Sequence, residues 1–314
     1  MKPCSNLDPR LGTRVLAFLV AVLLAGSASA QIFVSDYMRG IVGAYSMSGQ
    51  PLVRSSANAV GPIGIAYDGQ GNLFVVPRGG STPSTVMEMR TSGRVVNSAL
   101  ISGLPQPQGI ALDGNGHIFI SEQNVAYPDH GGTIAEYTTS GQVVNSTLIV
   151  GDIFTTWQGL ACDGQGHLYA ASQSGSGNGI DLYTTTGNLI QIGLISGLSA
   201  PHGIALDGQG HVFVANFGSG TVGEYTTSGQ TVNAALISGL DRPSGIALDS
   251  MGDLFVSCYG SGTIGEYTTS GAVVNASLVS GLSTPYLGLV VVPEPSSLAL
   301  AVVSLGAILL RRKA

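Results

Sequence analysis

Charged side chains are scarce in this sequence, and basic ones are the scarcest. The 314 residues include 12 Lys plus Arg and 18 Asp plus Glu, or 10% charged, against about 25% in an average globular protein. No run of Lys or Arg occurs before the last four residues, which excludes the basic patch of a nucleic-acid-binding protein. From Gln31 to Val292 there are 6 basic and 16 acidic residues, so this segment repels polyanions.

Cysteine is nearly absent. The chain has 3 Cys, too few for a disulfide-stabilised scaffold. Cys4 lies in the N-terminal segment described below. Cys162 and Cys258 lie two repeat units apart, whereas a disulfide needs Cα atoms within about 7 Å. We therefore predict no disulfide.

Glycine, by contrast, is abundant. The 46 Gly make up about 15% of the chain, twice the usual share of about 7%. A hydrophobic fraction of 44% and a net charge of only -6 argue against an acidic disordered chain. The composition indicates a turn-rich β protein with few charges.

The N-terminus has the features of a Sec-type signal peptide. A basic start and an apolar stretch of about 11 residues precede a small-residue cleavage site; these are Lys2, Arg10 and Arg14, residues 15–25, and Ala28-Ser29-Ala30. The apolar stretch is shorter than the roughly 20 residues that span a bilayer. We predict that residues 1–30 are removed by cleavage between Ala30 and Gln31, with the Sec translocase as export partner.

The C-terminus carries a second sorting signal. It consists of Pro293-Glu294-Pro295, an apolar stretch over 298–310, and the basic cluster Arg311-Arg312-Lys313. Residues 293–314 resemble the PEP-CTERM sorting tail of exported bacterial proteins. The resemblance implies transient membrane anchoring, cleavage by an exosortase, and passage through the inner membrane and periplasm of a Gram-negative-type bacterium to its surface or matrix.

A permanent membrane anchor is the alternative for this tail. The 13 apolar residues of 298–310 would span about 20 Å of a ~30 Å hydrocarbon core. That length favours the processed tail. The basic cluster would stay on the cytoplasmic side and halt export until cleavage.

The segment between the two signals is a repeat. Gly-(Ile/Leu) begins at six positions with spacings of 45, 50, 44, 42 and 43: Gly64, Gly109, Gly159, Gly203, Gly245 and Gly288. An aromatic residue before small or branched apolar residues also recurs six times, at Phe33, Phe74, Phe119, Tyr169, Phe213 and Phe255. Six copies in residues 31–292 give about 44 residues per unit, the length of a four-stranded propeller blade.

The repeat therefore predicts an all-β fold, a six-bladed β-propeller of four-stranded blades. Asp207-Gly-Gln-Gly is expected to form the first hairpin turn of its blade, because Asp bonds the turn backbone and Gly supplies positive φ. Thr-Thr-Ser-Gly is expected to form a second turn at 138–141, 226–229 and 268–271. The segment starts on a second strand at Ile32 and ends on a first strand, so residues 285–292 are predicted to close the first blade and remove two exposed edges.

The unit P-x-G-I-A-x-D-x-x-G-x-(L/V)-(F/Y)-V resembles the NHL-type repeat of six-bladed propellers, over the whole of 31–292. The Asp that this repeat usually has after the second strand is poorly kept; the slot holds Asp36, Pro77, Glu122, Ser172, Asn216 and Cys258. The resemblance implies two enzyme classes among relatives. Some are lyases that hold a divalent metal with several His, and others hydrolyse lactones with carboxylates and Asn.

The candidate binding site is the face where first strands begin, because propellers commonly bind ligands there. The residues before the repeated Gly surround the mouth of the central channel: Ile63, Gln108, Gln158, His202, Ser244 and Leu287. The long loop from Glu122 to Gly132 adds Asp129 and His130. The predicted ligand-binding residues are His202, Trp157, Gln108, Gln158, Glu122, Asp129, His130, Asn216 and Tyr259.

Three functions fit this site. The first is an exported propeller that binds a polysaccharide or peptide, since sugars stack on aromatic rings and hydrogen-bond to amides. The second is a metal-dependent lyase or lactone hydrolase, which needs about three protein ligands, His202 with partners such as Glu122, Asp129 or His130. The third is a passive structural protein. We assign no catalytic residue, predict no cofactor except a divalent metal if the lyase interpretation holds, and expect no nucleic-acid partner.

Two further sets of residues recur in the repeat. His117, His167 and His211 occupy one slot after the first turn and are expected to flank that turn rather than share a metal ion. Glu136, Glu224 and Glu266 precede Tyr on third strands and are expected to face solvent, because strand side chains alternate between faces.

Overall fold

The fold is taken from a computed structural model that describes residues 29–52, 61–78, 84–123, 131–174 and 177–294. Residues 31–292 form one compact unit, and a second unit comprises 1–30 and 293–314. Every regular element in the described residues is a β-strand. Within these ranges no helix has the length and apolarity needed to cross a membrane.

The strands form six antiparallel sheets, or blades, among the described residues. Blade 1 contains β1 (Gln31–Asp36), β2 (Ile41–Ser46) and β23 (Pro285–Val292). Blade 2 contains β3 (Pro62–Tyr67), β4 (Asn72–Pro77), β5 (Ser84–Arg90) and β6 (Val95–Leu104). Blade 3 contains β7 (Pro107–Leu112), β8 (His117–Glu122), β9 (Thr133–Thr138) and β10 (Val143–Val150).

The remaining three blades follow the same order. Blade 4 contains β11 (Thr156–Cys162), β12 (His167–Ser174), β13 (Gly177–Thr184) and β14 (Leu189–Ser196). Blade 5 contains β15 (Pro201–Leu206), β16 (His211–Asn216), β17 (Thr221–Thr226) and β18 (Thr231–Ile237). Blade 6 contains β19 (Pro243–Leu248), β20 (Asp253–Cys258), β21 (Thr263–Thr268) and β22 (Val273–Val279). The predicted six-bladed propeller is confirmed.

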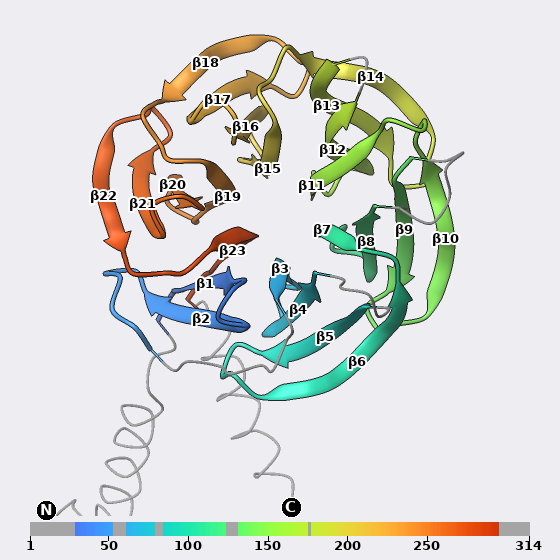
Figure 1. Cartoon of the computed structure of the whole chain (residues 1–314), viewed down its shortest axis with the longest axis horizontal. Coiled ribbons are helices and arrows are strands. Elements are labelled where there is room, and N and C mark those ends of the chain that lie inside the picture. Colours follow the sequence, from blue (N-terminus) through green and yellow to red (C-terminus); the bar gives the residue numbers. More distant parts are fainter. Residues whose placement is uncertain (1–28, 53–60, 79–83, 124–130, 175–176, 295–314) are drawn as a thin grey trace, which may run out of the picture. The chain divides into compact units, whose positions relative to one another are not determined.

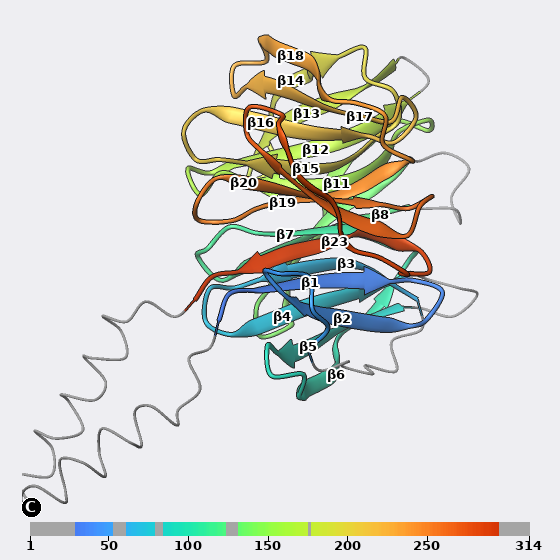
Figure 2. The ribbon, with the colours of Figure 1, turned by 90° about the vertical axis from the view of Figure 1, so that its left-hand side faces the viewer.

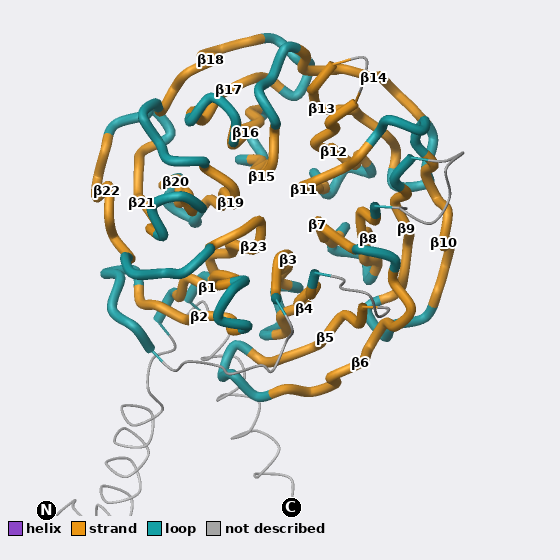
Figure 3. The backbone as a smooth tube through the Cα atoms, viewed as in Figure 1, coloured by secondary structure: helices purple, strands orange, loops and turns teal. Residues whose placement is uncertain are grey.

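The blades stand around a central axis with their first strands innermost (Figures 1 and 3). The side view shows the same stack of blades edge on (Figure 2). The last strand, β23, pairs with β1 in antiparallel register from Gln31↔Val292 to Asp36↔Pro285. This confirms the predicted closure, since residues 285–292 supply the inner strand of blade 1. The described outer part of this blade is a bridge between Tyr45 and Pro51.

The repeated Gly of each inner strand is required by close backbone packing. A Cβ at Gly109 or Gly159 would collide with the carbonyl oxygen of Gln158 or His202 on the next inner strand, and a Cβ at Gly203 would lie 2.5 Å from the Ser244 oxygen. The same contact continues through Gly245, Gly288 and Gly64 and returns to Gln108. The six glycines therefore let the inner strands approach one another around the whole ring.

The first hairpin turn has the predicted chemistry. Asp207 accepts the backbone N–H groups of Gln209 at 2.7 Å and His211 at 3.0 Å through one carboxylate oxygen. Gly208 and Gly210 have φ of 70° and 107°. The apolar core lies between neighbouring blades; for example, Phe213 of blade 5 packs in one cluster with Val256 of blade 6.

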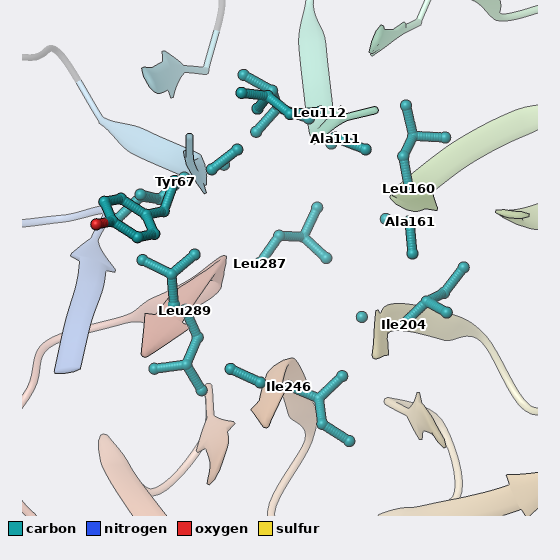
Figure 4. Close-up of a pocket in the computed structure, with 18 of the residues that line it drawn as sticks. Tyr67, Ala111, Leu112, Leu160, Ala161, Ile204, Ile246, Leu287 and Leu289 are labelled. Atoms are coloured by element: carbon teal, nitrogen blue, oxygen red, sulfur yellow. The ribbon is translucent and has the colours of Figure 1, made fainter. Parts of the chain in front are cut away.

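The central channel is apolar. A cavity of about 340 Å³ runs between the inner strands and is lined by their Gly-Ile-Ala-Leu segments. Figure 4 shows Leu160, Ile204, Ile246 and Leu287, from four different blades, around this space. The side chains that line the channel are apolar, so polar side chains are found at the channel mouth instead.

Candidate functional site

The channel-mouth face is the side of the ring where inner strands begin and second strands end. Register pairs place Pro107 beside Glu122, Pro201 beside Asn216 and Pro243 beside Cys258. The variable slot after each second strand therefore lies next to the start of the inner strand, as predicted.

Around this mouth, Gln108, Gln158 and His202 follow one another on blades 3, 4 and 5. The contacts of the inner-strand glycines define this order, since Gly109 meets Gln158 and Gly159 meets His202. The exposed fractions of the Gln108, Gln158 and His202 side chains are 4%, 6% and 6%. The Gln158 Oε1 atom is buried without a hydrogen-bond partner in the described part of the chain.

His202 lies in a cluster of aromatic rings drawn from three blades. Its imidazole stacks on Phe217 with ring centroids 4.3 Å apart and an interplanar angle of 21°. Tyr286 lies 5.6 Å from His202, and Tyr259 lies 5.8 Å from both Phe217 and Tyr286. We call these four residues the aromatic cluster. The Arg242 guanidinium lies 5.2 Å from the centre of the Tyr259 ring and borders the cluster.

Burial keeps the imidazole of His202 uncharged at neutral pH. Desolvation lowers the pKa of His202 to about 4, because a buried site disfavours the charged form. Its polar contact is with the Ser244 hydroxyl, at 3.4 Å. His202 therefore offers a neutral, flat ring rather than a cation.

Strained backbone before the inner strands positions two of these rings. Ala200 and Arg242 have φ of 47° and 55°, in the left-handed region that side chains disfavour. The Ala200 carbonyl accepts the backbone N–H of Phe217 at 3.1 Å, and the Arg242 carbonyl accepts that of Tyr259 at 3.0 Å. Gln106 in blade 3 has the same conformation, with φ of 44°, and its carbonyl accepts the backbone N–H of Gln123 at 3.1 Å, so this arrangement belongs to the repeat.

Glu122 is a buried carboxyl on the same face, at the end of β8. Its exposed fraction is 4%, the Thr133 hydroxyl donates to Oε2 at 3.3 Å, and Oε1 has no partner among the described residues. Burial raises the pKa of Glu122 to about 7, against the opposing effect of hydrogen bonds from Thr133 and Tyr137. A carboxyl that titrates near neutrality can act as a general acid or base.

The raised pKa of Glu122 predicts pH-dependent stability. The folded chain holds this proton more tightly than the unfolded chain, so the stabilising contribution is complete below about pH 4.5 and is lost as pH rises through about 7. A shift of this size corresponds to about 3 kcal/mol. We expect Glu122→Gln to match the parent at pH 4 and to exceed it by up to about 3 kcal/mol at pH 8 in urea unfolding. Glu88→Gln, at a half-buried carboxylate, is the control, and equal pH profiles for parent and Glu122→Gln would contradict the expectation.

The slot that holds Glu122 has a structural role in blade 1. Asp36 accepts the backbone N–H groups of Ser283 at 2.9 Å and Thr284 at 3.2 Å, and so ties the start of β23 to β1. Asn216 in blade 5 is 3% exposed, and its Oδ1 is unpaired within the described ranges. The residue at this repeat position therefore differs in role between blades. In blade 1 it is a structural carboxylate, whereas in blades 3 and 5 it has a polar atom without a hydrogen bond among the described residues.

Comparison with models of protein families shows which family this chain belongs to. The family model described as "Virginiamycin B lyase family" matches residues 81–308, nearly three quarters of the sequence. The chain belongs to the virginiamycin B lyase family. No curated protein shows significant sequence similarity to this chain.

Solved structures show the same fold as this family member at low sequence identity. A chain from a nidogen/laminin complex has a TM-score of 0.68 and 16% identity, with 84% of this chain and 98% of that chain covered. A streptogramin B lyase structure has a TM-score of 0.58 and 17% identity, with 83% of each chain covered. A protein of unknown function from Bacteroides caccae has a TM-score of 0.62 and 14% identity, with 85% of this chain and all of that chain covered.

The described residues of this family member do not form a metal site. They contain no group of three His, Cys, Asp or Glu side chains placed to hold one ion. The rings and hydroxyl around His202 belong to Phe217, Tyr286 and Ser244, none of which is a carboxylate. Asp129 and His130, the partners predicted for a metal at His202, lie outside the described residues.

Trp157 does not occupy the position that a ligand-stacking aromatic requires. Its exposed fraction is 1% and it packs in the core against Tyr183, because it enters the space between blades 3 and 4 instead of facing solvent. Tyr259, also predicted, is half-buried within the aromatic cluster. Tyr286 was not predicted, and its signal is one extra residue in Pro285-Tyr286-Leu287-Gly288, where four other blades have Pro-x-Gly.

The repeated His and Glu residues lie away from the channel mouth. His117 and His167 contact the Asp of their own turns at 3.0 Å and 2.7 Å, as expected for turn-flanking residues. The predicted exposure of Glu136 and Glu224 is wrong, since their exposed fractions are 9% and 8%. Glu136 lies 3.7 Å from His117, and Glu224 lies 3.0 Å from His211.

Cys162 and Cys258 are free thiols. Cys258 is buried in the core between blades 5 and 6. Cys162 is half-buried beside the central channel.

Proposed function

We propose that this chain is an exported binding propeller whose aromatic cluster holds a neutral ring or apolar segment of a polysaccharide or peptide. The observation that carries the proposal is the stack of a neutral His202 on Phe217 at 4.3 Å, flanked by two tyrosines. Such a surface binds sugar rings or side chains by stacking. The amides of Gln108 and Gln158, next along the mouth, can hydrogen-bond to hydroxyl or carbonyl groups.

Export rests on the two ends of the sequence. The basic and apolar segment ending at Ala30 has the order of a signal peptide. The Pro293-Glu294-Pro295 motif, with its apolar stretch and Arg311-Arg312, has the order of an exosortase substrate. We propose a location at the cell surface or in the matrix after both ends are removed.

The binding proposal is tested by His202→Ala on the full chain. We expect at least a tenfold loss of affinity for the neutral oligosaccharide or peptide that the parent binds best in a panel, measured by calorimetry. His211→Ala, at the far end of β16 from the channel mouth, is the matched control and should bind as the parent does. Absence of binding by the parent across the panel would overturn the proposal.

A lyase is the second candidate, favoured by the buried Glu122 carboxyl with its pKa near 7. One of the similar folds is a streptogramin B lyase. In this alternative Glu122 takes or gives a proton at a substrate held over the channel mouth. Consumption of virginiamycin B by the parent, reduced at least a hundredfold in Glu122→Gln, would favour this function over simple binding.

A further inference from the structure

A second cavity, which we call the side cavity, lies between blades 3 and 4. Its volume is about 670 Å³, within the range of roughly 300–1,000 Å³ typical of small-molecule sites. It is lined by parts of β10, β11, β13 and β14 and by the loop before β11, including Asp152, Trp157, Asp181, Tyr183, Leu189 and Ile192. None of these belongs to the aromatic cluster.

Two departures from the repeat meet in the side cavity. Trp157 stands where four other inner strands begin with Pro, at Pro62, Pro107, Pro201 and Pro243. Asp181 stands on β13 where the third strands of the other blades have small or apolar residues: Gly43, Met87, Ala135, Gly223 and Gly265. Blade 4 thus has an indole and a carboxylate where its sister blades have neither.

The carboxylate changes the local packing of the third strand. In blades 5 and 6 a tyrosine lies across the glycine, with the Tyr225 and Tyr267 hydroxyls 2.6 Å from the place of a Cβ at Gly223 and Gly265. Asp181 has a Cβ at this position, so Tyr183 cannot lie there. Tyr183 instead meets Trp157 edge to face, with ring centroids 6.4 Å apart.

The side cavity contains polar groups that the protein does not satisfy. Asp181 is 6% exposed; one carboxylate oxygen accepts the Gly193 N–H at 2.9 Å, and the other, which has no hydrogen bond within the described residues, is not fully buried. The Trp157 Nε1–H is buried and likewise unpaired within the described ranges. Buried polar groups usually have partners, and the lining contains no Lys or Arg to neutralise Asp181.

We propose that the side cavity binds an organic ammonium ion with an apolar body. The ammonium group donates to the unpaired oxygen of Asp181, a charge-assisted hydrogen bond. The body lies along Leu189 and Ile192, which are 53% and 68% exposed at the rim, with Tyr183 and the edge of Trp157 in the cavity wall.

The single tryptophan of the chain makes this proposal directly measurable. Trp157 fluorescence of the full chain is followed during titration with 2-phenylethylamine and with 2-phenylethanol, a neutral molecule of the same shape. We expect a saturable change with the amine and at least tenfold weaker binding of the alcohol. N-acetyl-lysine amide, titrated in parallel, distinguishes a free amine from a lysine side chain of a peptide.

Asp181→Asn isolates the charge, since Asn retains an oxygen for the Gly193 N–H. We expect at least a tenfold loss of amine affinity, a change below twofold for the alcohol, and parental binding in the control Asp241→Asn, an exposed acid of blade 6. Unchanged amine binding in Asp181→Asn, or equal binding of amine and alcohol by the parent, would overturn the proposal. The comparison of amine with alcohol uses the parent alone, so it tests the proposal even if Asp181→Asn fails to fold. His202→Ala, which alters the channel mouth, should leave amine binding unchanged.

Discussion

A chain that ends at Thr284 should lose the cooperative unfolding transition of the propeller, whereas a chain that ends at Val292 should retain it. The eight residues between them form β23, the inner strand of blade 1. Their removal takes away the pairing with β1 and leaves the inner edge of that strand exposed.

The size of this effect follows from what β23 buries. Leu289 and Val292 are 4% and 7% exposed, and they belong to the cores on the two sides of blade 1. Loss of each large buried side chain typically costs about 2–5 kcal/mol, and the lost backbone pairing adds to this. The sum approaches the total stability of about 5–15 kcal/mol of an ordinary domain.

Thermal melts followed by far-UV circular dichroism measure this directly. At roughly 2–4 °C per kcal/mol, we expect the midpoint of the chain ending at Thr284 to fall by more than about 10 °C or the transition to vanish. The chain ending at Val292 lacks only residues 293–314 of the parent and is the matched control. Equal midpoints for the two shortened chains would mean that β23 does not close the ring.

Gly159→Ala should cost about 3 kcal/mol of unfolding free energy, the upper range for a side chain forced into a filled space. A methyl group there would collide with the His202 carbonyl on the neighbouring inner strand. Gly159 does not have a positive φ, so its backbone conformation is one that alanine can adopt. The cost of Gly159→Ala is therefore steric. The change also presses on the strand that carries His202.

Gly239→Ala separates this steric cost from ordinary glycine strain. Gly239 has φ of 76° and nothing within 4 Å of its would-be Cβ, so its substitution costs only the backbone strain of roughly 1–2 kcal/mol. Urea unfolding of the two variants against the parent gives both values. If Gly159→Ala were no more destabilising than Gly239→Ala, the packed glycine contacts around the axis would not limit stability.

The surroundings of individual side chains were harder to predict than the blades. Glu136 and Glu224 were expected in solvent from strand alternation, but they are buried beside the imidazoles of His117 and His211. Trp157, predicted as a ligand-binding residue, fills space between two blades. Both placements depend on what lies across a blade or between blades, about which local alternation carries no information.

The sequence by itself determined the number of blades, the turn chemistry and the closure by residues 285–292. The repeat period, the Asp-Gly turns and the strand on which the repeat begins can all be read from consecutive residues. A closed ring follows because the first and last strands would otherwise leave unpaired edges. Only the tertiary structure decided that His202 stacks on Phe217 beside Tyr259 and Tyr286, and that Asp181 and Trp157 share a cavity. Those contacts join residues from up to 84 positions apart, and they depend on how neighbouring blades meet, which no local pattern encodes.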